Sequence, residues 1–246
     1  IKLDCELEPM DLTLPEPDEA NLAELYTRFE FKGLLASLGS QAPEVESVRP
    51  AAIKTQYQLI DDPDALRAAI EACVRAGQFA LDTETTSVSP TQADLVGVSL
   101  SWAPGEACYI PVSHEVLEPQ LTLDELKAQL QPLLSNPDVT WIAQNLKYDW
   151  IVLTQAGFDI ACQLQDTMLI SYVLNATGSR HDMDTLALKH LNHQTIKFEE
   201  VCGKGKKQIL FSQVRLEAAR DYACEDADIT LRLFEVLKPQ LDAVPE

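Results

Sequence analysis

The sequence predicts an α/β fold in which helices flank a mixed sheet, with a short helical appendage at the N-terminus. Three segments with strand character follow one another between residues 79 and 112, and a further strand lies between two helical segments. With 246 residues, of which 46% are hydrophobic and 24% charged, the chain can form one large domain and an appendage. We therefore expect two parts, residues 1–52 and residues 53–246.

The first part, residues 1–52, has polar, proline-containing stretches at both of its ends. Between them, apolar residues recur at near-helical spacing from Leu22 to Leu38. Proline-rich and polar segments are typical of linkers. We therefore expect an acidic, proline-containing linker that carries one or two helices.

The main domain is expected to begin with a strand, a helix and a second strand. Residues 57–60 and 79–84 have strand character, and residues 63–76 between them have helical spacing. Gly77 follows this helix directly, and glycine suits the left-handed conformation at helix ends. The helix is therefore predicted to end at residue 76.

Two more strands follow, over residues 95–102 and 108–112. Pro104 and Gly105 lie between them and signal a turn. Consecutive strands joined by turns are antiparallel neighbours. We therefore expect the strand that ends at Glu84 and these two strands to form an antiparallel meander.

The rest of the chain is mostly helical in pattern. Thr122 and Glu125 form a capping box that begins a helix running to about Leu134, and residues 139–143 read as a short buried strand. The remaining apolar spacing predicts helices over residues 146–156, 167–174, 183–191 and 217–237. A meander followed by helix, strand and helix is the ribonuclease H-like arrangement.

The net charge of −20 excludes a protein that coats nucleic acid through electrostatics, because such binding depends on Lys and Arg displacing counterions. One segment departs from this balance, with six basic residues against four acids between residues 180 and 207. If the chain handles a polyanion, this segment is where its backbone would be held. The basic residues are Arg180, Lys189, Lys197, Lys204, Lys206 and Lys207.

The composition also bears on location. No apolar run is long enough for a membrane span, and no signal peptide begins the chain, so we expect a cytoplasmic protein without a membrane partner. The six cysteines lie far apart, which predicts reduced thiols and not zinc ligands or disulfides. Because the chain begins with Ile1, we interpret it as a piece of a longer protein.

Asp82 and Glu84 end the strand over residues 79–84. Side chains alternate along a strand, so the two carboxylates point to one face. Adjacent acids repel one another, and removing each from water costs several kcal/mol. A divalent cation such as Mg²⁺ or Mn²⁺ is the simplest partner, and a solvated turn is the alternative interpretation of the pattern.

Two further acids lie on apolar helix stripes, where a charge is out of character. Asp149 is one of them, although an acid in a first turn also favours the helix dipole. Asp226 lies well inside the last helix, where that explanation fails. The spacing predicts that the solvated side of this helix carries Asp221, Glu225, Asp228, Arg232 and Glu235.

Tyr222 precedes Asp226 by four residues, so the phenol and the carboxylate share one face of the helix. With a reference pKa of about 10, a tyrosine hydroxyl is protonated at neutral pH. It suits hydrogen-bonding a water better than removing its proton. A metal would therefore have to acidify that water.

Three motifs occur in order along the main domain: Leu81-Asp82-Thr83-Glu84-Thr85, Gln144-Asn145-Leu146-Lys147-Tyr148-Asp149 and Tyr222-Ala223-Cys224-Glu225-Asp226. In this order and at these separations they resemble the exonuclease motifs of the proofreading domain in family A polymerases of the bacterial DNA polymerase I type, the DEDDy class. Stretches at residues 109–112, 180–184 and 198–206 match the same family. The resemblance covers about residues 57 to 240.

The resemblance implies a metal-dependent 3'-5' exonuclease. Asp82, Glu84, Asp149 and Asp226 would bind two divalent metal ions, Mg²⁺ or Mn²⁺ with Zn²⁺ as an alternative at one site, and Tyr222 would orient the attacking water. Nucleotides would leave single-stranded or frayed DNA 3' ends by two-metal phosphodiester hydrolysis, as nucleoside 5'-monophosphates. Substrate contacts are implied for Val88, Gln144, Asn145, Tyr148, Arg180 and Phe198.

The resemblance also implies a setting. A polymerase domain would follow Glu246 in the parent chain, and residues 1–52 would correspond to the linker after a 5' nuclease domain. The protein would act at the bacterial nucleoid. Position 88 is a departure, because leucine is common there in relatives and this chain has valine.

Two other functions stay open at this point. An exoribonuclease of the ribonuclease D type has much the same three motifs, and discrimination of the 2'-hydroxyl cannot be read from sequence. A non-catalytic DNA-end-binding domain would use the same acids without metal. The basic loop over residues 203–207 is either a phosphate contact or solvated surface.

Overall fold

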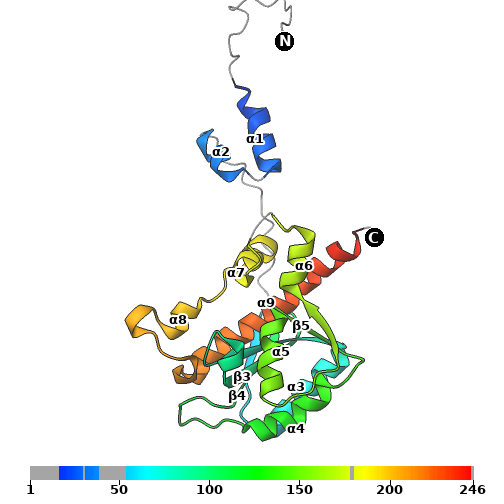
Figure 1. The fold of residues 1–246 in the computed structure, drawn as a ribbon, viewed down its shortest axis with the longest axis vertical. Coiled ribbons are helices and arrows are strands. Elements are labelled where there is room, and N and C mark those ends of the chain that lie inside the picture. The colour runs from blue at the N-terminus through cyan, green and yellow to red at the C-terminus, as the bar shows by residue number, and fades with distance from the viewer. Residues whose placement is uncertain (1–16, 30, 39–53, 178–179, 245–246) are drawn as a thin grey trace, which may run out of the picture. The chain divides into compact units, whose positions relative to one another are not determined.

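The computed structural model describes residues 17–29, 31–38, 54–177 and 180–244. The chain divides into two compact units, Ile1–Val48 and Arg49–Glu246. Most of the expected linker sequence, residues 1–16 and 39–52, lies outside the described residues. Figure 1 shows the elements of both units.

The first unit contains two short helices, α1 (Glu19–Arg28) and α2 (Lys32–Ser37). The side chain of Asp18 caps α1 by accepting a hydrogen bond of 3.1 Å from the backbone N–H of Asn21. The rings of Tyr26 and Phe31 meet edge to face at 6.3 Å. A small aromatic contact therefore holds the two helices to each other.

The second unit is built on a six-stranded mixed sheet with the order β1-β4-β3-β2-β5-β6. β2, β3 and β4 pair antiparallel, as the predicted meander requires, while β1 pairs parallel with β4 and β5 pairs parallel with β2 and β6. The strands are β1 (Gln56–Leu59), β2 (Gln78–Thr85), β3 (Leu95–Ala103), β4 (Glu106–Pro111), β5 (Thr140–Ala143) and β6 (Gln163–Asp166).

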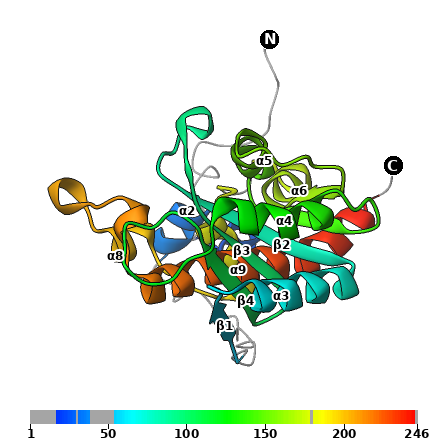
Figure 2. The ribbon, with the colours of Figure 1, turned by 90° about the horizontal axis from the view of Figure 1, so that it is seen from below.

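Helices cover both faces of this sheet. Phe79 and Leu81 pack in one core with α3, α4 and α5, whereas Ala80, which alternates with them, packs in another with α6 and α9. Figures 1 and 2 show α9 crossing the sheet as its longest helix. The helices are α3 (Pro63–Ala76), α4 (Leu123–Leu134), α5 (Leu146–Gln155), α6 (Thr167–Leu174), α7 (Met183–Leu186), α8 (Phe198–Cys202) and α9 (Leu216–Asp242).

Shorter helical turns complete the unit. α7 continues into a π-helical turn, η3 (Ala187–Leu191), so the helix predicted over residues 183–191 is present but changes its winding. Single 3₁₀ turns are η2 (Pro90–Gln92), η4 (Gly205–Lys207) and η5 (Phe211–Gln213). Within the described ranges, no helix combines the length and the hydropathy that crossing a membrane requires.

Local signals in the sequence explain where two helices begin and end. The side chain of Asp62 accepts hydrogen bonds from the first N–H groups of α3, and Gly77 ends this helix with φ +72°. The capping box of Thr122 and Glu125 is present at the start of α4. The bounds predicted for both helices are confirmed.

Two features of the sheet were absent from the sequence prediction. β6 has no alternating apolar pattern, because its residues are Gln, Leu, Gln and Asp, and only its pairing with β5 makes it a strand. The strand β1 was predicted, but its parallel pairing with β4 across the edge was not. Both depend on contacts between segments far apart in the chain.

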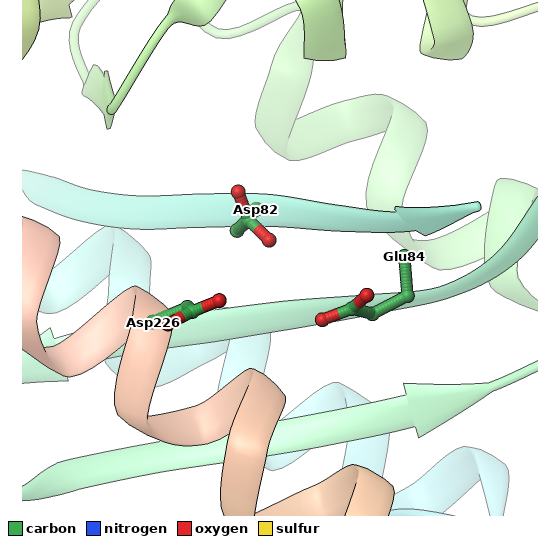
Figure 3. A group of neighbouring side chains, drawn as sticks. All are labelled: Asp82, Glu84 and Asp226. Atoms are coloured by element: carbon green, nitrogen blue, oxygen red, sulfur yellow. The ribbon is translucent and has the colours of Figure 1, made fainter. Parts of the chain in front are cut away.

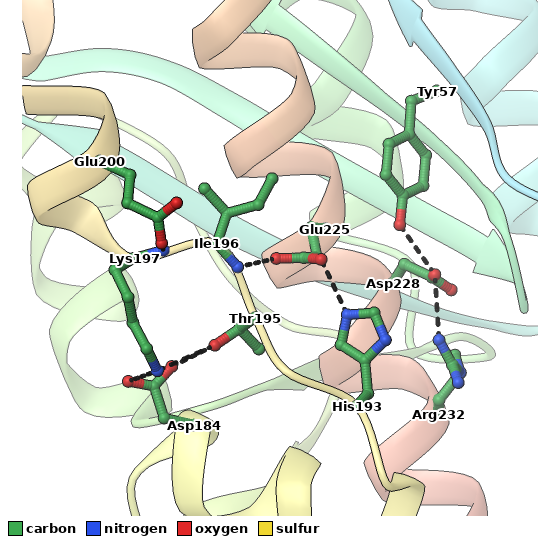
Figure 4. A network of polar contacts seen from close by, with 10 residues as sticks. All are labelled: Tyr57, Asp184, His193, Thr195, Ile196, Lys197, Glu200, Glu225, Asp228 and Arg232. Atoms are coloured by element: carbon green, nitrogen blue, oxygen red, sulfur yellow. Dashed lines mark hydrogen bonds and ion pairs between the residues drawn. The ribbon is translucent and has the colours of Figure 1, made fainter. Parts of the chain in front are cut away.

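The prediction that Glu225, Asp228 and Arg232 face solvent is wrong. The Arg232 side chain is only 12% exposed and lies 3.7 Å from Asp228. Asp228 is fully buried and accepts hydrogen bonds from the Tyr57 hydroxyl at 3.0 Å and the Gly105 N–H at 2.7 Å. Glu225 is buried as well, against a segment described below (Figure 4). The middle of α9 is enclosed on more than one side, so the rule of one apolar and one solvated face does not apply to it.

Substituting Asp228 with alanine should destabilise the fold. The change leaves the part-buried Tyr57 hydroxyl and the buried Gly105 N–H without an acceptor, and we expect a loss of about 3 kcal/mol in the free energy of unfolding. Urea denaturation of the metal-free chain measures it. Asp221→Ala, an exposed position on the same helix, is the matched control and should change stability by about 0.5 kcal/mol or less. Equal losses in both variants would contradict the anchoring role of Asp228.

Candidate active site

A cavity of about 480 Å³, called the main cavity below, lies where β2 ends. Its walls come from the end of β2 and the residues after it, the start of α5, Phe198 of α8, residues 208–211 and α9. All four acids singled out in the sequence, Asp82, Glu84, Asp149 and Asp226, line it together with Tyr222. Segments from distant parts of the chain therefore meet at one site.

Three of the acids converge closely. Asp82, Glu84 and Asp226 each offer a carboxylate oxygen, and these oxygens all lie within 4.8 Å of one another. Figure 3 shows the two carboxylates of β2 and the one of α9 turned toward a common point. Alternation along β2 directs both of its acids to the face that α9 covers, which is why they meet Asp226.

Asp149 reaches the cavity from α5 and is held by β2. Its Oδ1 atom accepts hydrogen bonds from the backbone N–H of Thr83 at 3.2 Å and from the Thr83 hydroxyl at 2.6 Å. This N–H is free for Asp149 because the pairing of β2 with β5 ends at Ala80. The open edge of β2 therefore fixes the fourth acid beside the other three.

The acid cluster is electrostatically unfavourable by itself. Burial raises the pKa of Asp82 to about 7, although a hydrogen bond from the backbone of Thr83 opposes the rise. Burial also raises the pKa of Glu84 well above its usual range, and the charges of Asp82, Asp226 and Asp149 add to that effect. The pKa values of Asp149 and Asp226 are raised too, first by burial and then by the charge of Asp82.

These carboxylates fit a divalent cation. The Oε1 atom of Glu84 is buried without a hydrogen-bond partner, and in the described part of the chain no Lys, Arg or His forms an ion pair with any of the four acids. Carboxylate oxygens are the ligands that Mg²⁺ and Mn²⁺ prefer. The site is therefore a candidate metal centre, with Asp82, Glu84 and Asp226 as its closest donors.

Tyr222 stands one turn before Asp226 on α9 and lines the same cavity. Burial and the charges of Asp226, Glu84 and Asp82 raise the pKa of Tyr222 well above its usual range. The ring packs edge to face against Phe198, with centroids 6.3 Å apart, and at a tilt of 52° against Phe211, with centroids 5.8 Å apart. The phenol is therefore a protonated donor held in a fixed orientation.

Most of the other residues predicted to contact substrate also line the cavity. Asn145 is the N-cap of α5 with φ +67°, and the hydroxyl of Tyr148 donates to the backbone carbonyl of Ser87. The predicted contacts that line the cavity are Val88, Gln144, Asn145, Tyr148 and Phe198. Arg180 lies outside this lining, with its side chain 86% exposed and its Nε atom 3.0 Å from Asp182.

Two supporting acids were missed by the sequence prediction. Asp166 is buried and accepts hydrogen bonds from N–H groups at the start of both α5 and α6, which fixes the entry to the helix that carries Asp149. An aspartate directly before a helix is an N-cap signal that could have identified half of this role. Its hydrogen bonds to the start of α5 depend on the fold, which brings residues 145 and 146 next to Asp166.

Glu225 is the other supporting acid. It accepts a hydrogen bond from the Ile196 N–H at 2.6 Å and lies 2.8 Å from Nε2 of His193 (Figure 4). Lys197 follows and pairs with Asp184 at 2.6 Å. These contacts hold the segment that leads into Phe198 against α9.

Comparison with known proteins places this geometry among exonucleases. A family model described as 3'-5' exonuclease matches residues 57–242. DNA polymerase I of Pseudomonas aeruginosa is 42% identical over 255 residues, covering 100% of this chain and 28% of that protein. DNA polymerase I of Rhizobium leguminosarum is 40% identical over 186 residues, covering 68% and 18%. The chain thus spans less than a third of the length of these curated relatives.

Solved structures share the fold at lower identity. Escherichia coli RNase D, an exoribonuclease, is 20% identical with a TM-score of 0.59, covering 77% of this chain and 46% of that one. Brucella melitensis NrnC with bound Mg²⁺ is 21% identical with a TM-score of 0.54, covering 77% and 83%. The predicted ribonuclease H-like fold class is confirmed by these similarities.

The metal-free chain should lose stability as the pH rises from about 5.5 to 8. A carboxyl whose folded pKa is raised favours folding while it is protonated, and this contribution fades as the pH passes the folded pKa, about 7 for Asp82. A loss of about 1 kcal/mol lowers the Tm by roughly 2–4 °C in a chain of this size. Thermal unfolding in EDTA measures the effect.

Glu84→Gln supplies the matched control, because it removes one of the repelling charges and keeps the shape of the side chain. In EDTA at pH 8 this variant should melt above the unsubstituted chain, and its Tm should depend less on pH. Mg²⁺ should raise its Tm less than that of the unsubstituted chain. A variant with the same pH dependence as the unsubstituted chain would refute the repulsion at Glu84.

Proposed function

The chain belongs to the 3'-5' exonuclease family of DNA polymerase I, and from this membership we propose that it removes nucleotides from single-stranded or frayed DNA 3' ends and releases nucleoside 5'-monophosphates. Residues 53–246 would form the catalytic domain. The observation that carries the proposal is the convergence of Asp82, Glu84 and Asp226 within 4.8 Å, with Asp149 beside them. Such a cluster has a physical reason to exist if cations neutralise it.

We infer that the four carboxylates hold two divalent ions, with Mg²⁺ as the cation in the cell. Bound there, the ions would lower the pKa of an attacking water and stabilise the leaving oxygen at phosphorus. The protein's part is to fix the donors: β2 presents two carboxylates, α9 presents one, and Thr83 holds Asp149. Manganese, or zinc at one position, is compatible with the same oxygen donors.

The remaining residues of the cavity position the substrate in this proposal. The Tyr222 hydroxyl, protonated at neutral pH, donates a hydrogen bond that orients the water for in-line attack. Phe198 and Val88 flank the terminal bases, and a ring can stack on any base, which suits removal without regard to sequence. Gln144, Asn145 and Tyr148 contact sugar or phosphate from the start of α5.

Arg180 does not line the main cavity, so its proposed role differs from that of the other substrate contacts. Its exposed guanidinium pairs with Asp182, which lines a smaller cavity next to Tyr222 and Asp226. We propose that it contacts a phosphate of the strand outside the main cavity. Such a contact would depend on salt more than those inside.

The cellular setting follows from the relatives. They are DNA polymerase I chains, and we propose that this domain proofreads for a polymerase domain in its parent chain, in the bacterial cytoplasm at the nucleoid. RNA is the rival substrate, because E. coli RNase D shares the fold. Initial rates on matched DNA and RNA oligonucleotides with the same 3' overhang decide between them, and faster cleavage of RNA would overturn the DNA assignment.

Asp226→Ala should abolish cleavage of a labelled 3'-overhang DNA in Mg²⁺. Removing this donor forfeits several kcal/mol of transition-state stabilisation, so the rate should fall by about 10³-fold or more. Asp221→Ala, an exposed acid of the same helix, should keep the original rate. Ordinary cleavage by the Asp226 variant would show that the acid cluster is not the catalytic centre.

Calorimetry with Mn²⁺ separates the non-catalytic alternative, a domain that holds DNA ends without metal. The unsubstituted chain should bind the ion, and Asp226→Ala should bind it more weakly. A chain that binds no Mn²⁺ while it binds DNA ends would favour the non-catalytic alternative.

A further inference from the structure

Apolar side chains are exposed at the mouth of the main cavity. Val88 and Phe198 are two of them, and the other two are Ile209 and Leu210, which are 40% and 50% exposed. All four line the cavity that contains the acid cluster. Single exposed apolar residues need no explanation, but four around one polar cavity indicate a binding surface.

Ile209 and Leu210 are not needed to fill the core. The next residue, Phe211, is buried and packs its ring against Tyr222 at 5.8 Å, so it supplies the hydrophobic anchor of this segment. Ile209 is held by its backbone, whose N–H donates to the carbonyl of Cys202 at 2.8 Å. The backbone N–H of Leu210 donates to the Gln213 side chain at 3.2 Å. The backbone of both residues is therefore fixed while their side chains remain exposed.

The backbone bond between Ile209 and Cys202 closes a tight basic loop over residues 203–208. Gly203 has φ +78°, and a Cβ atom there would lie 3.0 Å from the Lys207 carbonyl oxygen, so the turn requires glycine. Figures 1 and 2 show this loop projecting beside α8, away from the body of the domain. The loop leads directly into residues 208–211, which line the cavity, so its lysines adjoin the cavity lining in the sequence.

Two of those lysines are available to an anion. Lys204 pairs with Glu199 at 2.9 Å, whereas Lys206 and Lys207 are exposed and form no ion pair within the part of the chain that the structure describes. The chain as a whole carries 39 acids against 19 Lys and Arg. Lys206 and Lys207 therefore place two cations without an ion-pair partner, among the described residues, on the segment that leads into the cavity lining.

We propose that residues 206–210 form a nucleotide-binding subsite for single-stranded DNA, in which Ile209 and Leu210 pack against a base upstream of the scissile bond. Lys206 and Lys207 hold the adjoining phosphates. The pairing of an apolar surface with cations on one short segment matches the two chemical parts of a nucleotide. The inference rests on the proposed function, since it assumes that a DNA strand enters this cavity.

The double substitution Ile209→Ser/Leu210→Ser tests the base contact. With Mg²⁺, the KM for decathymidylate should rise about five-fold or more while kcat stays unchanged, because the contact lies away from the scissile bond. The rate on a thymidine dinucleotide, too short to reach the subsite, should not change. Leu188→Ser, which removes an exposed leucine of η3 outside the cavity lining, is the matched control and should leave the decathymidylate KM and the dinucleotide rate unchanged.

Substituting Lys206 and Lys207 with glutamine tests the phosphate contact independently. Binding of fluorescein-labelled decathymidylate in EDTA, followed by anisotropy over a range of salt, should show a slope of log Kd against log salt that is smaller by about 1.4, or about 0.7 for each of two contacts. Circular dichroism checks that each variant is folded. If the serine pair does not fold, Leu210→Ser alone takes its place.

The outcomes separate this inference from the proposed function. If the unsubstituted chain cleaves DNA and both variants match it in KM and salt slope, the subsite is refuted and the exonuclease assignment stands. If the chain cleaves no DNA, the proposed function fails, and the same anisotropy measurement made on the serine and glutamine variants decides the subsite: unchanged binding in both variants refutes it and weaker binding supports it.

Discussion

Repulsion between buried carboxylates is the interaction on which the rest of the main unit depends. The folded chain holds Asp82, Glu84 and Asp226 within reach of one ion, although their negative charges favour separation. β2 cannot release its two acids, because it pairs with β3 from Ala80 to Thr85. α9 cannot move its acid away, because Asp228 ties the same stretch of the helix to β1 and to the β3–β4 turn. Strand pairing and hydrogen bonds around the cavity therefore offset the electrostatic cost inside it.

The uneven pairing of β2 makes room for the fourth acid. One edge of this strand is paired to β3 up to its last residue, Thr85, whereas on the other edge the pairing with β5 ends at Ala80, one residue before β5 itself ends. Side chains complete the open edge: the indole N–H of Trp141 donates to the Leu81 carbonyl, and Asp149 accepts from Thr83. A fully paired strand would leave no backbone donor for Asp149. The site thus depends on β5 being short as much as on the presence of the acids.

The sequence predicts the elements whose beginning and end are set by neighbouring residues. It does not predict strand pairing or burial that depends on contacts between distant segments. The bounds of α3 follow from Asp62 and Gly77, and the period of α9 identified Asp226. The same period failed for Glu225 and Asp228, because their partners, His193 and Tyr57, approach from segments that the helix pattern does not contain. Contacts between distant segments also determine three other features: the pairing of β6, the hydrogen bonds of Asp166 to both α5 and α6, and the exposure of Ile209. Periodicity identifies an acid on an apolar face of a helix, but it does not identify the residue from another segment that forms a hydrogen bond with that acid.

A chain of net charge −20 faces a difficulty when its proposed ligand is a polyanion. In the proposals above, phosphates are contacted at the acid cluster and at the basic loop, and the two contacts would overcome the repulsion in different ways. In the proposed function, the positive charge at the acid cluster would come from solution, so the scissile phosphate would be held only when cations are present and cleavage would be coupled to the same ions. Away from the cluster a permanent charge is harmless to that coupling, and there the loop at residues 203–208 supplies lysines. Fixed cations inside the cavity would instead neutralise the carboxylates as ion pairs and displace the catalytic ions. Lysines outside the cavity lining, as Lys206 and Lys207 are, would avoid that competition while still contributing to DNA binding.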